Sequence, residues 1–173
     1  MTEDERELIF SLVIFPGEDK GISKEEFLKE FRPCIDKSEI VNDLLKESCD
    51  SKKADDVESA LAVGFALGFN LRELNVLHDL AVADWHNSHE DIVSALAELK
   101  SPASVNVLYN LTQWVPGYLE FDDARALAVK AIWALAGIPS EHAQAALSQL
   151  SHSNNPIFKE SAMRAGLASR GLV

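Results

Sequence analysis

The chain has 173 residues, a formal net charge of −12 and hydrophobic residues at 47% of its positions. This composition is typical of a soluble globular protein of one domain, long enough to bury a core without metal ions or disulfides. Lysine and arginine form no cluster, which argues against direct binding of nucleic acid. The acidic balance suits a basic protein partner, and solubility alone also accounts for it.

Cys34 and Cys49 stand in the polar first third of the chain and form no Cys-x-x-Cys pair. We therefore expect free thiols, with a single bridge as the alternative. Residues 2–7 are too acidic for the start of a secretory signal. The longest apolar stretch, residues 60–69, is too short to span a bilayer. The sequence thus predicts a cytoplasmic protein that does not contact membranes.

The first 56 residues predict a less regular, helical N-terminal part. Thr2 with Glu5, and Ser23 with Glu26, have the spacing of a capping box, in which a hydroxyl and a carboxylate bond each other's backbone amides at a helix start. Apolar residues follow both pairs at helical spacing. Three helices are predicted here: about 3–15, stopping at Pro16-Gly17; from Ser23 to before Pro33; and about 38–49.

Residues 57–173 predict helices that follow one another in pairs, and no stretch alternates as a strand would. Leu108 and Leu111 recur as Leu147 and Leu150, an offset of 39 residues. HEAT-like repeats of two helices have nearly this period. The sequence therefore predicts an all-α fold, an α-α superhelix of HEAT-like helical pairs in a single domain of residues 1–173. The predicted helices cover about 57–69, 71–83, 88–100, 102–114, 124–136, 141–151 and 156–170. The last five of them have recognisable starts, at Ser88, Pro102, Asp122 and Asp123, Ser140, and Asn155-Pro156.

Three segments carry a resemblance to a known family: Trp85 to Val93, the turn Leu99 to Val105, and Ala126 to Leu135. Together with Leu108-Tyr109 and Tyr118-Leu119, they resemble small bacterial HEAT-repeat proteins, several of which are immunity proteins of contact-dependent growth inhibition and other polymorphic toxin systems. The resemblance covers about residues 71–165. It implies a cytosolic inhibitor that binds one cognate toxin, often a nuclease, and blocks its active site.

The segment from Trp85 to Asp91 is the first candidate site. His86 and His89, followed by Glu90 and Asp91, carry groups that can bind a metal ion. Ser88 and Asp91, however, have capping-box spacing, so a helix start between the two histidines is the simpler interpretation. Structural capping and packing is therefore preferred over metal binding, and contact with a partner through Trp85 and the histidines is the third alternative.

The segment from Tyr118 to Asp123 is the second candidate site. It combines an aromatic side chain with Glu120, Asp122 and Asp123 in a loop, a composition suited to a basic cleft on a partner. The competing interpretation is that Asp122 and Asp123 only cap the following helix. Trp133 in that helix is predicted to lie in the core.

No Gly-rich phosphate loop, Gly-x-Ser-x-Gly sequence or Cys–His pairing is present, so we expect neither an enzyme nor a cofactor. The favoured function is an immunity protein whose acidic and aromatic residues occlude a basic, RNase-type toxin domain. A HEAT-type scaffold for another protein is the alternative, and a metal-dependent hydrolase using the segment from His86 to Asp91 is a third. The predicted partner-binding residues are Asp84, Trp85, His86, His89, Glu90, Asp91, Tyr118, Glu120, Asp122 and Asp123.

Overall fold

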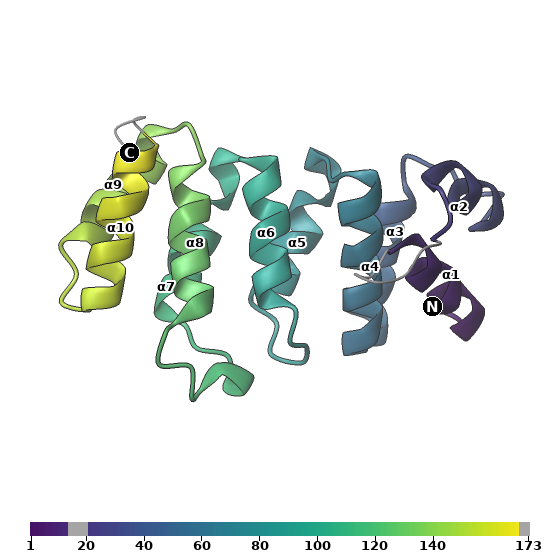
Figure 1. Ribbon diagram of the computed structural model, residues 1–173, viewed down its shortest axis with the longest axis horizontal. Coiled ribbons are helices and arrows are strands. Elements are labelled where there is room, and N and C mark those ends of the chain that lie inside the picture. Colours follow the sequence, from purple (N-terminus) through teal and green to yellow (C-terminus); the bar gives the residue numbers. More distant parts are fainter. Residues whose placement is uncertain (14–20, 170–173) are drawn as a thin grey trace. The chain divides into compact units, whose positions relative to one another are not determined.

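The computed structural model describes residues 1–13 and 21–169, and within these ranges the chain forms helices and connecting loops with no strand (Figure 1). The predicted all-α class is confirmed. The expected end of the first helix at Pro16-Gly17 lies outside the described residues. The α-helices are α1 (Glu3–Leu12), α2 (Lys24–Glu30), α3 (Ile40–Ser51), α4 (Ala54–Leu67), α5 (Leu74–Ala81), α6 (His89–Leu99), α7 (Val105–Gln113), α8 (Ala126–Ala136), α9 (Glu141–Ser151) and α10 (Pro156–Ala168).

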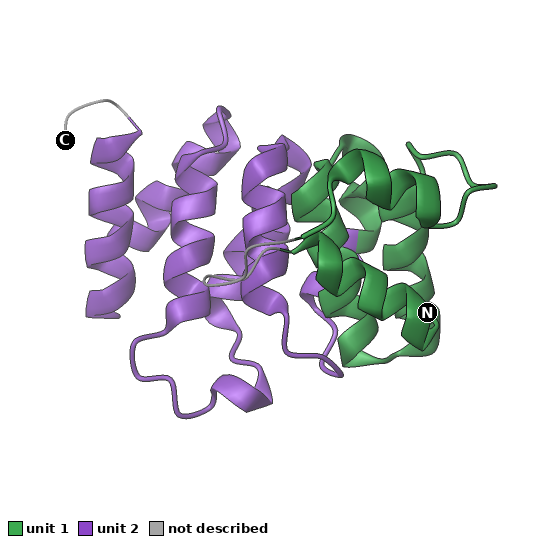
Figure 2. Ribbon diagram, turned by 45° about the vertical axis from the view of Figure 1, so that its right-hand side comes forward, with its two compact units in different colours: residues 1–76 green, residues 77–173 purple. Residues whose placement is uncertain are grey.

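The chain divides into two compact units, residues 1–76 and residues 77–173, and the boundary falls inside α5 (Figure 2). Three short 3₁₀ turns, η1 (Leu71–Glu73), η2 (Pro102–Ser104) and η3 (Gly117–Leu119), lie between the α-helices. Pro102 therefore opens a 3₁₀ turn that leads directly into α7, where a helix start was predicted. Cys34 and Cys49 form no disulfide.

Several of the predicted helix starts are confirmed by their hydrogen bonds. The Thr2 and Ser23 hydroxyls accept from the backbone amides of Glu5 and Glu26, and both carboxylates bond back to complete the capping boxes. Ser140 accepts from the amide of Ala143 at 3.1 Å. These caps satisfy amides that have no partner inside their own helix.

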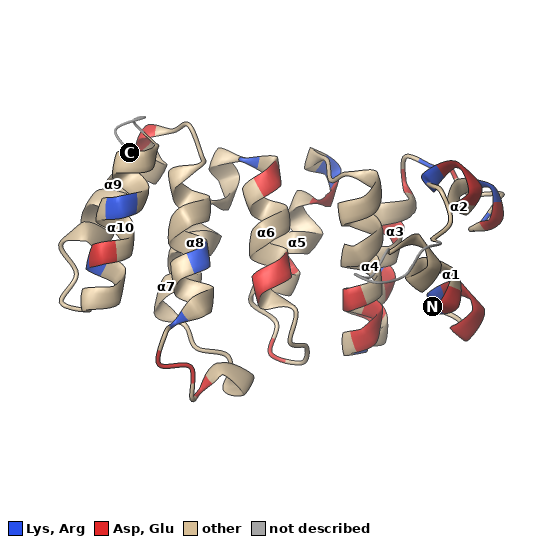
Figure 3. Cartoon of the chain, in the orientation of Figure 1, with Lys and Arg blue, Asp and Glu red and all other residues tan. Residues whose placement is uncertain are grey.

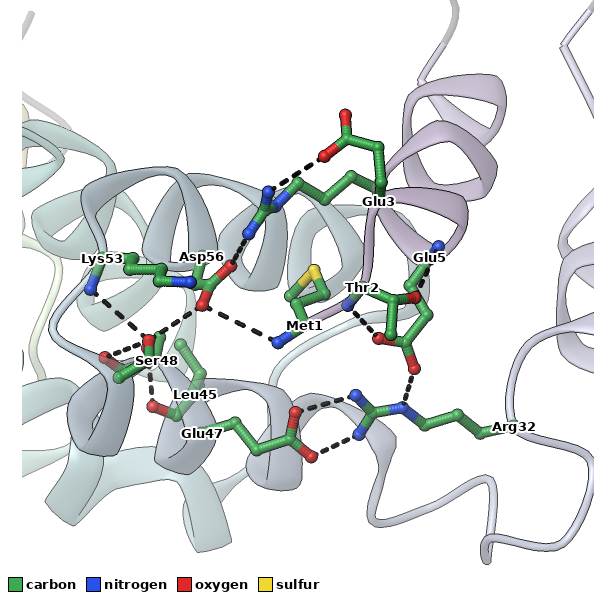
Figure 4. A network of polar contacts seen from close by, with 12 residues as sticks. Met1, Thr2, Glu3, Glu5, Arg32, Leu45, Glu47, Ser48, Lys53 and Asp56 are labelled. Carbon is green, nitrogen blue, oxygen red and sulfur yellow. Dashed lines mark hydrogen bonds and ion pairs between the residues drawn. The ribbon is translucent and has the colours of Figure 1, made fainter.

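In unit 1, the side chain of Arg32 joins α1 to α3 (Figure 4). Its Nε donates to Glu5 at 2.7 Å and its Nη2 donates to Glu47 at 2.7 Å. Arg32 itself has the left-handed backbone conformation, with φ of 44°, at the turn after α2. A planar guanidinium suits this double contact because its donors diverge in one plane.

A second polar contact in unit 1 buries the carboxylate of Asp56 at the start of α4, where the side chain is 1% exposed (Figure 4). Arg6 Nη2 and the Ser51 hydroxyl donate to it at 2.7 and 2.8 Å. Burial raises the pKa of the Asp56 carboxyl, but these hydrogen bonds outweigh burial and hold the pKa below its ordinary value. The carboxylate is therefore charged and paired inside the unit.

Gly64 is a buried glycine of α4 that lies against the ring of Phe69. A Cβ atom placed on Gly64 would overlap that ring. Gly68 then ends α4 with φ of 98°, a left-handed conformation that glycine adopts without a steric cost.

In unit 2, α8 packs against its neighbours on both sides, namely α6, α7, α9 and α10. Leu127, Ala131, Ile132 and Leu135 are buried on the covered face of α8. The prediction that Trp133 lies in the core is wrong, because its side chain is 46% exposed. The helix is apolar almost all round, so its composition does not reveal which side the neighbouring helices leave uncovered.

Candidate functional site

Two loops of unit 2 form the candidate site, and we call them the paired loops: residues 82–88 between α5 and α6, and residues 114–125 between α7 and α8. In both Figure 1 and Figure 2, the two loops lie at the same end of the helices that they connect. Each loop carries one of the two segments singled out by the sequence. The structure therefore brings the two predicted sites together.

Five aromatic and imidazole rings, which we call the ring cluster, hold the paired loops together. The rings of His86 and His89 stack with centroids 4.4 Å apart, and Tyr118 stacks on the other side of the cluster, 5.5 Å from His89. Trp85 meets His86 edge to face at 5.0 Å, and Trp114 meets His89 in the same way at 5.0 Å. Offset and edge-to-face arrangements at these distances are favourable for ring quadrupoles.

Hydrogen bonds fix the protonation of both histidines. His86 Nε2 lies 2.9 Å from the Leu80 carbonyl oxygen, and His89 Nε2 lies 2.7 Å from the Ala83 carbonyl oxygen. A carbonyl only accepts, so each Nε2 carries the proton. Each Nδ1 then accepts: that of His86 from the Ser88 amide at 3.2 Å, and that of His89 from the Tyr118 hydroxyl at 3.1 Å.

The environment keeps both imidazoles neutral. His86 and His89 are 1% and 0% exposed, and burial lowers the pKa of each ring, against the opposing effect of its carbonyl partner. A positive charge on His86 would lower the pKa of His89 further. His89 is also the first residue of α6, where the helix dipole disfavours a cation. Burial raises the pKa of the Tyr118 hydroxyl, so this donor stays protonated.

The second half of the longer loop is fixed by Asp122 and Arg125. The Asp122 carboxylate accepts from the amides of Ala124 at 3.1 Å and Ala126 at 2.6 Å, so it bonds the first residue of α8, although the N-cap position is Arg125 and neither Asp122 nor Asp123 occupies it as predicted. Arg125 has φ of 54°, donates to the Thr112 carbonyl at 3.4 Å and lies over the Phe158 ring at 5.2 Å. The space under this part of the loop is only about 10 Å³, so the loop packs directly on α8.

The paired loops expose both apolar side chains and carboxylates to solvent. Phe121 is 91% exposed, Val82 58% and Tyr118 41%. The carboxylates of Asp84, Glu120 and Asp123 are exposed in the same loops, and Asp91 is exposed in the first turn of α6 (Figure 3). We call this set of seven side chains the loop surface. Isolated exposed apolar residues are ordinary, but an apolar group with a polar rim is typical of protein interaction sites.

The predicted site residues divide between this surface and its support. Trp85 is half-buried, and His86 and His89 are buried, so these three hold the loops in place. Glu90 is half-buried and its Oε2 lies 3.7 Å from Lys130 Nζ, while Asp122 caps α8.

The predicted Ser88–Asp91 capping box is wrong, because the Ser88 side chain makes no cap hydrogen bond; its amide donates to His86 instead. The helix start between the two histidines is nevertheless confirmed. The sequence interpretation also left Phe121 and Val82 out of the predicted site. The signal for Phe121 was its position between Glu120 and Asp122 in a loop, where an aromatic residue has no core to enter.

The segment from His86 to Asp91 does not offer metal ligands. Both nitrogens of both imidazole rings take part in hydrogen bonds, so neither ring has a free lone pair. Among residues 1–13 and 21–169, no group of three or more His, Cys, Asp or Glu side chains is arranged to hold a metal ion. The hydrolase alternative therefore gains no support from this segment.

Comparisons with known proteins do not identify a family for this chain. No family model matches the chain, and searches of curated proteins and of solved structures find no significant match. Among the helices of the described residues, none combines the length and the apolar character needed to cross a membrane.

Proposed function

We propose that the protein is an immunity protein that binds a basic toxin domain through the loop surface and occludes the active site of that toxin. The observation that carries this proposal is the exposed Phe121 side chain, framed by Glu120 and Asp123 on a loop fixed at both ends. The resemblance of residues 71–165 to HEAT-repeat immunity proteins supplies the biological role.

Preorganisation supports binding by this surface. The Tyr118–His89 hydrogen bond and the Asp122 cap order the loop before any partner arrives. Little conformational entropy then remains to be lost on association, and an aromatic side chain already held at the surface can fill a pocket.

Charge supports the nature of the partner. Asp84, Asp91, Glu120 and Asp123 are all exposed, and the one lysine or arginine of the paired loops, Arg125, is half-buried over the Phe158 ring. A partner whose active-site cleft binds phosphates is lined by positive charge, and opposite potentials accelerate its encounter with this surface. A nuclease-type toxin fits this description.

The packing of unit 2 supports the predicted superhelix. Helix α7 contacts α9, and α8 contacts α6 and α10, as expected when helical pairs stack in parallel layers. In such a stack the connecting loops gather at the edges, where they are free to vary with the partner.

Affinity purification of the tagged protein from its own cells, washed at low and at high salt and read by mass spectrometry, tests the proposal. The expected result is one dominant partner with a basic toxin domain, and addition of the protein should abolish the activity of that domain. A set of several partners, none of them a toxin, would instead favour the scaffold alternative.

Two variants then test the assignment of the surface. Phe121→Ala, and the triple variant Asp84→Asn, Glu120→Gln and Asp123→Asn, should each weaken toxin binding by at least about tenfold. The matched control neutralises three exposed carboxylates in unit 1 by Glu25→Gln, Glu30→Gln and Asp50→Asn, and should bind normally. Unchanged binding by both loop variants would refute the site.

A further inference from the structure

An open groove of about 690 Å³ lies at the C-terminal end of α8, between that end and helices α9 and α10. Its lining includes Leu135, Ile138, Leu147 and Ala162. The remaining lining residues are apolar, small or uncharged, so among residues 1–13 and 21–169 no ionisable side chain lines the groove. Such a groove accepts apolar side chains and gives a charged ligand no partner.

The rim of this groove also carries projecting apolar side chains. Met163 and Leu167, one turn apart on α10, line the groove and are 53% and 45% exposed. One surface therefore offers both protruding apolar groups and a space that can receive them. Contacts between identical subunits about a two-fold axis require this self-complementarity, because each partner presents the same residues.

The charge distribution favours a second copy of this chain as the occupant. The whole chain has a net charge of −12, yet residues 126–169 contain two acidic residues, Glu141 and Glu160, and three basic ones, Lys130, Lys159 and Arg164. A second copy of this acidic chain is repelled by most of the molecule and not by this region. A basic partner, in contrast, gains no electrostatic attraction here, because this region has no excess of carboxylates.

We propose that the α8–α10 groove is a homodimer interface, in which Met163 and Leu167 of each copy enter the groove of the other. The groove lies at the C-terminal end of α8, whereas the paired loops precede its N-terminal end. An 11-residue helix separates them by about 16 Å. The dimer therefore leaves the loop surface uncovered and presents two copies of it.

Sedimentation equilibrium of the full chain over a range of concentrations tests the proposal. The expected result is a mass that rises from 19.0 kDa to twice that value with a micromolar dissociation constant. High salt should leave the dimer intact or tighten it, because the contact is apolar and screening reduces the repulsion between two acidic copies.

Met163→Asp with Leu167→Asp should weaken the dimer by at least about tenfold. Met163→Gln with Leu167→Gln should do so without adding charge. The matched control, Val82→Asp with Phe121→Asp, adds the same two charges at more exposed apolar positions of the loop surface and should still dimerise. Far-UV circular dichroism verifies that each variant is folded. A parent chain that is monomeric throughout, or a dimer unaffected by both changes at 163 and 167, would overturn the proposal.

Discussion

The hydroxyl oxygen of Tyr118 lies 3.1 Å from Nδ1 of His89, and this contact joins two segments separated by 29 positions in the chain. The half-exposed tyrosine connects the loop surface to a fully buried imidazole. Because the second nitrogen of that imidazole is bonded to the Ala83 carbonyl, the same ring also holds the shorter loop. His89 thus connects the two paired loops to each other.

Replacing Tyr118 by Phe should lower the free energy of unfolding by about 0.5–1.5 kcal/mol, because His89 Nδ1 loses its donor while the stacked ring is kept. Chemical denaturation measures this loss, and hydrogen exchange should show faster opening of residues 115–121. Tyr109→Phe, in the middle of α7, is the matched control and should change neither quantity appreciably. Equal exchange rates in Tyr118→Phe and the parent would contradict the role assigned to this hydrogen bond.

Stability should fall as the pH is lowered through the histidine range. Burial holds the pKa values of His86 and His89 below 6.5, so between the folded and unfolded pKa values the unfolded chain binds more protons than the folded one. The two histidines contribute fully to the free energy of unfolding above pH 6.5. This contribution declines as the pH falls, by about 1.4 kcal/mol for each unit by which burial lowers a pKa.

Denaturation at a series of pH values measures this slope in the parent and in His86→Gln with His89→Gln. The double variant should have a flatter profile, whereas His142→Gln, at an exposed position of α9, should retain the parental slope. If the double variant kept the full pH dependence, these two rings would not be its source.

Two glycine-to-alanine changes in helices should have opposite effects. Gly64→Ala places a methyl group into the Phe69 ring and should cost about 1–3 kcal/mol. Gly166→Ala meets no atom within 4 Å and should stabilise α10 by about 0.5–1 kcal/mol, since alanine restricts the unfolded chain more. Thermal unfolding compares them, and adding Phe69→Ala to Gly64→Ala should relieve the overlap. A stabilising Gly64→Ala would show that the ring moves aside freely.

Asp56→Asn should destabilise unit 1, because Arg6 and Ser51 both donate to the lost charge. Hydrogen bonds to a charged group are worth about 1.5–3 kcal/mol, and the loss is expected in that range. The pKa of Asp56 is depressed, so its contribution is present above the unfolded value of 3.8 and disappears as pH falls through the folded value. Asp55→Asn, one residue earlier and exposed, is the control for urea denaturation at pH 7.

The sequence predicted those parts of the fold that depend on neighbouring residues. Ser140 was recognisable as a helix cap because its hydroxyl bonds an amide only three positions away. The all-α class likewise follows from local periodicity. Ser88 had the right spacing for a cap, yet its amide donates to the His86 ring. The position of that ring depends on the Leu80 carbonyl in the preceding helix and on stacking with His89.

The candidate site was predictable only as two separate segments. Nothing in the residue pattern indicates that Tyr118 reaches His89, because that contact requires α6 and the loop after α7 to be packed first. Trp133 was misplaced for a related reason. Its helix is apolar almost all round, and only the arrangement of its neighbours decides which side remains exposed.

The shared tautomer of His86 and His89 makes these rings natural reporters. Each ring holds one N–H proton against a carbonyl oxygen, at 2.9 and 2.7 Å, away from water. Such protons exchange slowly with solvent and give resolved downfield resonances in a proton magnetic resonance spectrum. Their linewidths record how often the two segments separate, without any label attached to the protein. Binding of the proposed toxin domain can therefore be followed from the imidazole signals of the unmodified chain.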